Sequence, residues 1–190
     1  TKPIIWHIMK YFSHYGYNEF IICLGYKGEI IKDYFTSYYS NNNDLTVDLS
    51  TNKFEIHKKH SENWKISLVD TGEETLTGAR IAKIKKYTEG ERFFLTYGDG
   101  LSNIDVNMLL QNHIDSNKKC TVSAVKPAGR FGVIKFLDNE VSFSEKNSKD
   151  VDWVNGGYFV CEQNIFEYVN ENDNVMWEGS PMEKLAKEKE

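Results

Sequence analysis

The chain has 190 residues, of which 40% are hydrophobic and 14% aromatic, which suits one folded domain with a sizeable core and excludes a disordered chain. Its formal net charge is −5 and its Lys and Arg residues are spread along the sequence, which argues against nonspecific binding to nucleic acids or membranes. Neither an apolar run of about 20 residues nor a signal-peptide pattern is present, so neither a membrane span nor secretion is predicted.

The first part of the chain predicts helix, strand, helix and then an irregular β excursion. Apolar residues at helical spacing predict a helix over residues 4–15, which Gly16 can end. The short apolar run 20–25 predicts a strand covered on both faces, and residues 27–39 predict a second helix. Residues 39–70 combine alternating segments with an Asn-rich break, which favours a small β-hairpin excursion over a further β-α unit.

Strands and helices alternate through the remainder. The predicted helices are 78–87, 106–116, 163–169 and 181–188, and the predicted strands are 92–97, 120–126, 131–136, 140–146 and 153–161. Alternation of this kind requires a mostly parallel sheet with helices on both faces. We therefore expect an α/β, Rossmann-like mixed sheet in a single domain over residues 1–190.

The three cysteines, Cys23, Cys120 and Cys161, lie far apart in apolar runs. Neither a CxxC motif nor a Cys/His pair accompanies them, so their spacing does not favour metal ligation. We interpret them as reduced core residues of a cytoplasmic protein.

The stretch "TYGDGLSNID" places Asp99 between two glycines, where the strand 92–97 ends. Ligands of open α/β sheets bind at the carboxyl ends of the strands, and a carboxylate there needs solvent, a cation or backbone donors. Mg²⁺ would suit it, since this ion takes one or two carboxylates together with phosphate oxygens. An Asx turn or a helix cap is the alternative role, and the local sequence leaves both open. Asp105 is the predicted N-cap of the helix 106–116.

Three other stretches carry polar residues at predicted strand ends. "DTGEETLTGAR" supplies Thr75 and, one helical turn after Thr77, Arg80; an N-cap with a solvated arginine is the alternative. "SFSEKN" ends a strand in Glu145 and Lys146, which could also be an ordinary surface pair. "WVNGGYFV" puts Asn155 and Gly156 inside a strand, which is typical of a bulge or of close approach by a ligand.

Taken in order, the motifs resemble a known family. "KPIIWHIMK", "LVDTGEETLTGARI", "FLTYGDGLSNID", "GRFGVIKF", "FSEK", "NGGYFV" and "WEGSPMEKLA" are similar to those of the glucose-1-phosphate cytidylyltransferases, a branch of the sugar nucleotidyltransferases. The resemblance covers essentially the whole chain. "TYGDG" and "MWEGSP" favour the cytidylyl branch over its uridylyl and thymidylyl relatives. The implied reaction joins CTP and glucose 1-phosphate into CDP-glucose and pyrophosphate with Mg²⁺.

The resemblance also implies a role for each motif. Asp99 would hold the catalytic Mg²⁺, and Gly98 would lie against the nucleotide. Thr75 and Arg80 would contact the nucleotide, with Arg80 near its phosphates. Lys146 would bind the sugar phosphate and, with Asp99 and Arg80, complete the catalytic set. The residues expected to line the sugar pocket are Glu145, Asn155 and Gly156.

The family pattern extends beyond this sequence at both ends. The glycine-rich phosphate-binding loop, with its catalytic Arg and Lys, would precede Thr1, and a second metal-binding aspartate would follow Glu190. We therefore expect a fragment with little or no catalysis by itself. Asn147 replaces the proline that is usual after the Glu-Lys pair. The resemblance further implies a homo-oligomer, for which the excursion at residues 40–60 is the predicted interface.

Other functions remain open at this point. One is a catalytically silent domain that binds a sugar phosphate or a nucleotide; others are a different sugar-1-phosphate nucleotidyltransferase or a metal-dependent glycosyltransferase. A general base is not required for nucleotidyl transfer, because a phosphate monoester is already an anion near pH 7. His7, His14 and His113 are accordingly predicted to be packing or surface residues. Trp177 is either a core residue or a stacking platform for a sugar.

Overall fold

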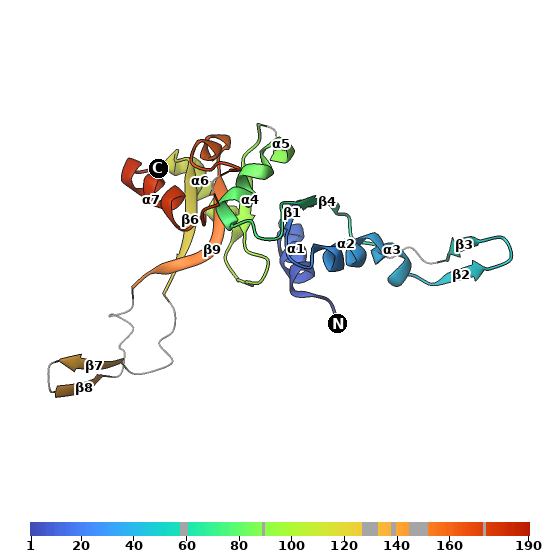
Figure 1. Cartoon of the computed structure of the whole chain (residues 1–190), viewed down its shortest axis with the longest axis horizontal. Coiled ribbons are helices and arrows are strands. Elements are labelled where there is room, and N and C mark those ends of the chain that lie inside the picture. The colour runs from blue at the N-terminus through green and yellow to red at the C-terminus, as the bar shows by residue number, and fades with distance from the viewer. Residues whose placement is uncertain (58–60, 89, 127–132, 138–139, 145–151, 173) are drawn as a thin grey trace.

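The computed structural model describes residues 1–57, 61–88, 90–126, 133–137, 140–144, 152–172 and 174–190. The N-terminal part is built on a two-stranded parallel sheet, shown in blue and green in Figure 1. Its elements are α1 (Ile4–His14), β1 (Glu19–Leu24), α2 (Gly28–Thr36), α3 (Tyr38–Asn41), β2 (Leu45–Asp48), β3 (Lys53–Ile56) and β4 (Lys65–Asp70). β1 pairs with β4 in parallel, whereas β2 and β3 form a separate antiparallel hairpin that extends away from that sheet (Figure 1).

The C-terminal part contains a three-stranded sheet. Its elements are α4 (Thr77–Lys83), α5 (Lys85–Thr88), β5 (Phe93–Thr96), α6 (Val106–Ser116), β6 (Cys120–Val125), β7 (Val133–Leu137), β8 (Glu140–Ser144), β9 (Val154–Cys161), the 3₁₀ helix η1 (Gln163–Glu167) and α7 (Ser180–Glu188). β9 lies between β5 and β6 and is antiparallel to both, so β5 and β6 run in one direction. β7 and β8 pair with each other as an antiparallel hairpin.

Helices cover both faces of the β5–β9–β6 sheet. The apolar side chains of β9 point alternately to the two faces, so both faces must be shielded from water. Phe159 and Cys161 belong to one apolar cluster, which also contains Ile81, Ile165, Phe166, Trp177 and Leu185 from α4, η1 and the C-terminal segment. Tyr158 and Val160 belong to the opposite cluster, which contains Ile8, Phe12, Val106 and Leu109 from α1 and α6. The three-layer α/β arrangement follows from this alternation.

α1 packs against both sheets. Phe12 lies 5.5 Å from Phe94 of β5, measured between ring centroids, whereas Met9 packs with Ile22 and Leu24 of β1. The spacing of these apolar residues is helical, so two adjacent stripes of α1 meet two different sheets. α1 therefore holds the two parts of the molecule together.

The same helix fixes the relative direction of β1 and β5. At its first turn, Ile5 lies near Gly98, just after β5, while Phe12 near its end contacts Phe94 inside β5. β5 thus runs antiparallel to α1. β1 also runs back along α1, after a tight turn in which Gly16 has a φ of 92°. The carboxyl ends of β1, β4 and β5 consequently point in the same direction along α1, and we call this side of the molecule the strand edge.

These observations confirm the predicted α/β class, with the parallel pairing in the β1–β4 sheet and the antiparallel pairings in the β5–β9–β6 sheet. Two predicted helices are broken in the structure. The segment 27–39 divides at Ser37, and 78–87 divides at Ile84, where ψ close to zero interrupts the regular helix. Residues 163–167 form a 3₁₀ helix. Among the described residues, no helix is long and apolar enough to span a bilayer.

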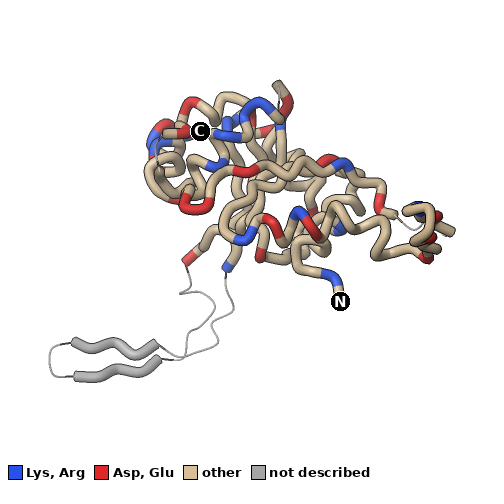
Figure 2. The backbone as a smooth tube through the Cα atoms, turned by 45° about the vertical axis from the view of Figure 1, so that its right-hand side comes forward, with Lys and Arg blue, Asp and Glu red and all other residues tan. Residues whose placement is uncertain are grey.

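Charged residues of both signs are interspersed along the described chain, as Figure 2 shows. With 28 Asp and Glu against 23 Lys and Arg, the protein has no general attraction for anions. An anionic ligand would therefore have to be bound where cations gather locally.

Candidate functional site

Asp99 lies on the surface at the carboxyl end of β5. Within the described part of the chain, its carboxylate accepts no hydrogen bond. The cap of α6 is Asp105, whose carboxylate accepts a hydrogen bond of 2.9 Å from the Met108 amide, as predicted. Asp99 is therefore neither that cap nor held by main-chain amides, and its charge faces solvent.

The glycines around Asp99 leave open space. A Cβ at Gly98 would meet only Ile5 Cδ1, at an ordinary contact distance of 3.9 Å, and a Cβ at Gly100 would meet nothing within 4 Å. Neither glycine has a positive φ. Packing of the described residues thus does not explain why these positions are glycine, whereas close approach of a ligand to the backbone would.

The loop that follows β4 is tied to the end of β1. Thr71 is 1% exposed, and both its amide and its hydroxyl donate to the Leu24 carbonyl, at 2.9 and 2.8 Å. The Asp70 carboxylate accepts from the Gly72 amide at 2.9 Å, and Gly72 has a φ of 96°. The loop therefore has a defined shape at the edge where Asp99 also lies.

Arg80 of α4 reaches across this loop. Its guanidinium donates to the Leu24 carbonyl at 2.9 Å, to the Thr71 hydroxyl at 2.6 Å and to the Glu73 carbonyl at 3.1 Å. The guanidinium lies against Gly25, where a Cβ would come within 2.6 Å of Nη1. Gly25 is thus a steric requirement for the position of Arg80.

Lys83, one turn further along α4, makes a similar set of contacts. Its ammonium donates to the Thr71 carbonyl at 2.7 Å and to the Thr75 hydroxyl at 3.1 Å. All of these acceptors are neutral, and neither Arg80 nor Lys83 forms an ion pair with a described residue. Two positive charges are therefore fixed at this edge without a carboxylate to neutralise them.

Tyr97, between β5 and Gly98, joins the end of β5 to its surroundings. Its hydroxyl donates to the Glu178 carboxylate and accepts from the Asn155 amide at 3.1 Å. Burial, followed by the hydrogen bond to Glu178, raises the pKa of Tyr97 to about 12, so the phenol stays protonated. A Cβ at Gly157 would come within 2.9 Å of the Tyr97 ring, so this glycine makes room for it.

Glu178 continues the network to α4. Its carboxylate accepts from the Thr77 hydroxyl at 3.1 Å, and Thr77 accepts from the Trp177 amide at 2.8 Å. The Gly78 amide donates to the Val175 carbonyl at 3.0 Å beside it. The end of β5 is thereby connected to the helix that carries Arg80 and Lys83.

The other predicted site residues are distributed differently. Asn155 joins the network through Tyr97 and also accepts from the Gly157 amide at 2.8 Å. A Cβ at Gly156 would come within 2.6 Å of the Ser123 hydroxyl on β6, so packing within the sheet already requires this glycine. Glu145 and Lys146 lie outside the described residues, as does Asn147.

Trp177 is a core residue. It is 1% exposed and meets Phe159 edge to face, with ring centroids 6.1 Å apart. The core interpretation is therefore confirmed, and this side chain offers no face to a sugar. Tyr97, Glu178 and Lys83 received no role from the sequence. An aromatic hydroxyl at a buried strand end and a carboxylate beside a buried tryptophan are the signals that could have identified the first two.

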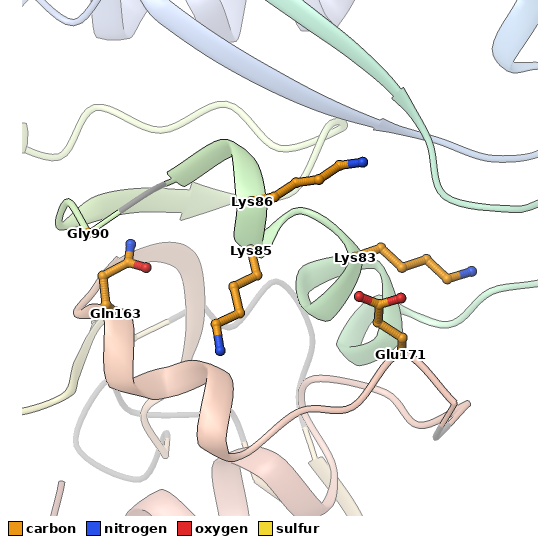
Figure 3. Close-up of a pocket in the computed structure, with 6 residues that line it drawn as sticks. All are labelled: Lys83, Lys85, Lys86, Gly90, Gln163 and Glu171. Atoms are coloured by element: carbon orange, nitrogen blue, oxygen red, sulfur yellow. The ribbon is translucent and has the colours of Figure 1, made fainter.

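A cavity of about 530 Å³ lies beside α5 and η1 and reaches Lys83 (Figure 3). Lys85 extends from α5 between Gln163 and Glu171, and the other residues that line the cavity are Lys83, Lys86 and Gly90. None of the predicted site residues that the structure describes lines this cavity. We therefore assign the site to the strand edge around Asp99.

Comparison with known proteins identifies the family. The family model described as "Nucleotidyl transferase" matches residues 1–188. The chain belongs to the nucleotidyl transferase family. It is 40% identical over 191 residues to the glucose-1-phosphate cytidylyltransferase of Salmonella typhimurium strain LT2 and 44% identical over 190 residues to the probable glucose-1-phosphate cytidylyltransferase of Bacillus subtilis strain 168. Each alignment covers 100% of this chain and 74% of the relative.

A solved structure supports the fold assignment. A putative glucose-1-phosphate thymidylyltransferase from Bacillus anthracis is similar with a TM-score of 0.62 and 11% sequence identity, covering 98% of this chain and 71% of that one. The resemblance stated from the sequence is confirmed by the family model and by the 40% and 44% identities to the two relatives. This nucleotidyl transferase chain has relatives that act in sugar-1-phosphate nucleotidyl transfer, and its strand-edge site can be interpreted in those terms.

Proposed function

We propose that these residues carry one part of the active site of a glucose-1-phosphate cytidylyltransferase, which converts CTP and glucose 1-phosphate into CDP-glucose and pyrophosphate. The observation that carries the proposal is that the exposed Asp99 and the unneutralised Arg80 and Lys83 lie at the carboxyl ends of strands that run in the same direction along α1. The 40% and 44% identities to relatives of this name support the choice of base and sugar.

The chemistry needs a site of this kind because the obstacle is electrostatic. An oxygen of the sugar phosphate attacks the α-phosphorus of the nucleotide, and pyrophosphate leaves in line. Two unit charges about 4 Å apart repel by roughly 1 kcal/mol in bulk water and by more in a shielded cleft. The positive charges of Arg80 and Lys83 would offset the repulsion between the phosphates of the two substrates. Hydrogen bonds to neutral oxygens hold both side chains in position without cancelling their charge.

The Asp99 carboxylate is suited to bind Mg²⁺. Mg²⁺ is usually bound by one or two carboxylates together with substrate phosphate oxygens, and a carboxylate that faces solvent without an internal donor is available for this. The described residues contain no group of three or more His, Cys, Asp or Glu that could hold a metal by themselves. When bound, the ion would neutralise phosphate charge and orient the triphosphate. The chain's own part is to keep the Asp99 carboxylate at the strand end.

On the sugar side, we propose Asn155 as a contact to the hydroxyl groups of glucose, since its amide is exposed and is oriented by Tyr97 and Gly157. Lys146 is proposed to bind the sugar phosphate and Glu145 and Gly156 to line the pocket, as the family resemblance implies. Thr75 and Gly98 are proposed to contact the nucleotide. The hydroxyl of Thr75 is already oriented by Lys83.

The test is pyrophosphate release by the protein extended at both ends to the length of its relatives. We expect release with CTP and glucose 1-phosphate, much less with other nucleoside triphosphates, and little or none from residues 1–190 alone. Release with UTP or dTTP in preference to CTP would reassign the base. Binding of CTP without turnover would support a silent binding domain, and transfer from CDP-glucose to an acceptor would support a glycosyltransferase.

We further propose that the enzyme is a cytoplasmic homo-oligomer. The hairpin β2–β3 supports the oligomer, because it extends from the sheet and exposes Val47 by 54%, Leu49 by 87% and Phe54 by 70%. Exposed apolar groups of this kind are typical of protein interfaces. Light scattering on Phe54→Asp should show a smaller assembly than on the parent protein, and an unchanged mass would remove the hairpin from the interface.

A further inference from the structure

Two of the three cysteines are brought together by the sheet. Cys120 of β6 and Cys161 of β9 are directly opposite in the register, and their sulfur atoms are 3.9 Å apart. Both are free thiols in the structure, and both lie on the sheet face that packs against α4, η1 and the C-terminal segment. The sequence, in which 40 residues separate them, predicted reduced core residues and did not indicate that these two are paired.

The backbone pairing favours a bond between them. The Glu162 amide donates to the Lys119 carbonyl at 2.9 Å, which makes Lys119 and Glu162 a hydrogen-bonded pair. Because such pairs alternate along antiparallel strands, Cys120 and Cys161 form a non-hydrogen-bonded pair, whose Cα atoms are typically about 4.5 Å apart. This value lies inside the range of about 4.4–6.8 Å found for disulfides. Side-chain rotation is therefore sufficient, and the strands need not move far.

The two thiols differ in reactivity. Cys120 is partly exposed, and the hydrogen bond from Cys161 lowers the pKa of its thiol, which favours the thiolate. Cys161 is fully buried, and its hydrogen bond with Cys120, followed by burial, raises the pKa of its thiol. Since the thiolate is the nucleophile, Cys120 is suited to attack an oxidant and Cys161 to attack Cys120 afterwards.

We propose that Cys120 and Cys161 are a reversible redox pair that a hydroperoxide converts into a disulfide between β6 and β9. With hydrogen peroxide, the Cys120 thiolate attacks one oxygen, the O–O bond breaks, and sulfenic acid and hydroxide form. The Cys161 thiol then attacks the sulfenic sulfur, the S–O bond breaks, and water leaves as the S–S bond forms. Hydroxide takes up the remaining proton, so the two thiols are oxidised and the peroxide is reduced to two waters. An external dithiol reverses the change.

A disulfide between Cys120 and Cys161 would constrain the chain segment that lies between them. It would cross-link the start of β6 to the end of β9, closing the segment that contains Asn155, Glu145 and Lys146. Asn155 lies at the other end of β9 from Cys161, so the disulfide would fix how this segment is attached and would not touch the strand-edge site directly.

Cys23 provides the matched control. It lies on β1, in the other sheet, and burial raises the pKa of its thiol to about 11, so it should react slowly. Purified protein of residues 1–190 is treated with graded hydrogen peroxide, alkylated, and analysed by intact mass and peptide mapping. We expect the loss of two hydrogen atoms, a peptide cross-linked between Cys120 and Cys161, and full reversal by dithiothreitol. Cys23→Ser should behave identically.

The single variants separate the two roles. Cys161→Ser should stop at a Cys120 sulfenic acid that a dimedone probe traps, whereas Cys120→Ser should leave Cys161 unmodified over the same time. If a serine variant does not fold, the alanine variant replaces it, and the cross-linked peptide of the parent protein decides by itself. Sulfinic acid without a cross-link, a disulfide that includes Cys23, or a bond between two chains would each overturn the proposal.

Discussion

Two regions of the candidate site differ in how strongly their side chains are bound by the rest of the protein. In the segment 70–83, the side chains of Thr71, Arg80 and Lys83 bind one another or nearby carbonyls. The segment 98–100 binds little of the protein, with an exposed carboxylate and open space at both glycines. The first region therefore fixes where positive charge lies, and the second is available for direct contact with a ligand.

The two regions show two different reasons why a position can be occupied by glycine. At Gly25, a Cβ would clash with the Arg80 guanidinium, so a larger residue is compatible with the fold only if that side chain moves away. At Gly98, nothing in the described protein excludes one. Substitutions in the two regions should consequently separate in stability and in ligand binding, and the predictions below begin with the largest effect.

Asp99→Asn tests the open region most directly. The substitution keeps the shape and removes the charge, so pyrophosphate release by the full-length enzyme should fall by at least about 100-fold, in the range of roughly 10²–10³ typical of a lost charge-stabilising group. Asp105→Asn is the control, because asparagine also caps helices and the change leaves the α6 cap intact. Equal losses of turnover in the two variants would contradict the metal-binding role of Asp99.

Gly25→Ala and Gly98→Ala test the contrast between the glycines. The methyl group at residue 25 should displace the Arg80 guanidinium from its hydrogen bonds, lowering the free energy of unfolding by about 1–3 kcal/mol and weakening nucleotide binding. The methyl group at residue 98 should leave unfolding unchanged and weaken nucleotide binding alone. Urea denaturation and calorimetric titration with CTP measure the two effects. If Gly98→Ala binds CTP normally, the nucleotide does not approach that backbone.

Sequence patterns predicted the regular parts of this fold and only the outline of the site. The helix 106–116 and its Asp105 cap followed from local periodicity, and the position of Asp99 followed from the end of an apolar run. The network of Tyr97, Glu178 and Thr77 could not be predicted, because its members are 20 to 101 residues apart and meet only through packing. The breaks at Ser37 and Ile84 likewise leave no mark in the periodicity.

Tyr97→Phe measures the connection between the two regions. Removing the hydroxyl takes one hydrogen bond from the partly buried Glu178 carboxylate, which still accepts from Thr77, and one from the exposed Asn155 amide. Loss of a hydrogen bond to a charged group costs about 1.5–3 kcal/mol. Tyr168→Phe is a matched control, since that hydroxyl also binds a carboxylate and a nitrogen donor but joins α7 to Lys119 at a distance from the site. Only Tyr97→Phe should also raise the KM for glucose 1-phosphate. An identical KM would confine Tyr97 to a stabilising role.

The smallest effect concerns pH and lies outside both regions. His113 of α6 is 1% exposed; its Nδ1 lies 2.8 Å from the Thr121 hydroxyl, and its Nε2 lies 3.2 Å from the Glu162 carboxylate, which also pairs with Arg92. Burial lowers the pKa of His113, with a smaller contribution from Arg92, although Glu162 opposes the shift. The folded protein therefore holds the imidazole neutral.

A lowered folded pKa sets the sign of the pH dependence. Below about pH 6.5, the ordinary pKa of histidine, the unfolded chain binds a proton that the folded protein excludes, so the stability due to His113 is complete above that pH and declines as the pH falls towards the folded pKa. Urea denaturation between about pH 7.5 and 5.5 should thus show decreasing stability, with a shallower slope in His113→Gln, which retains hydrogen bonding without titrating. A slope that is equal in both proteins would attribute the decline to other groups, and a steeper slope in His113→Gln would mean that the ion pair with Glu162 outweighs burial.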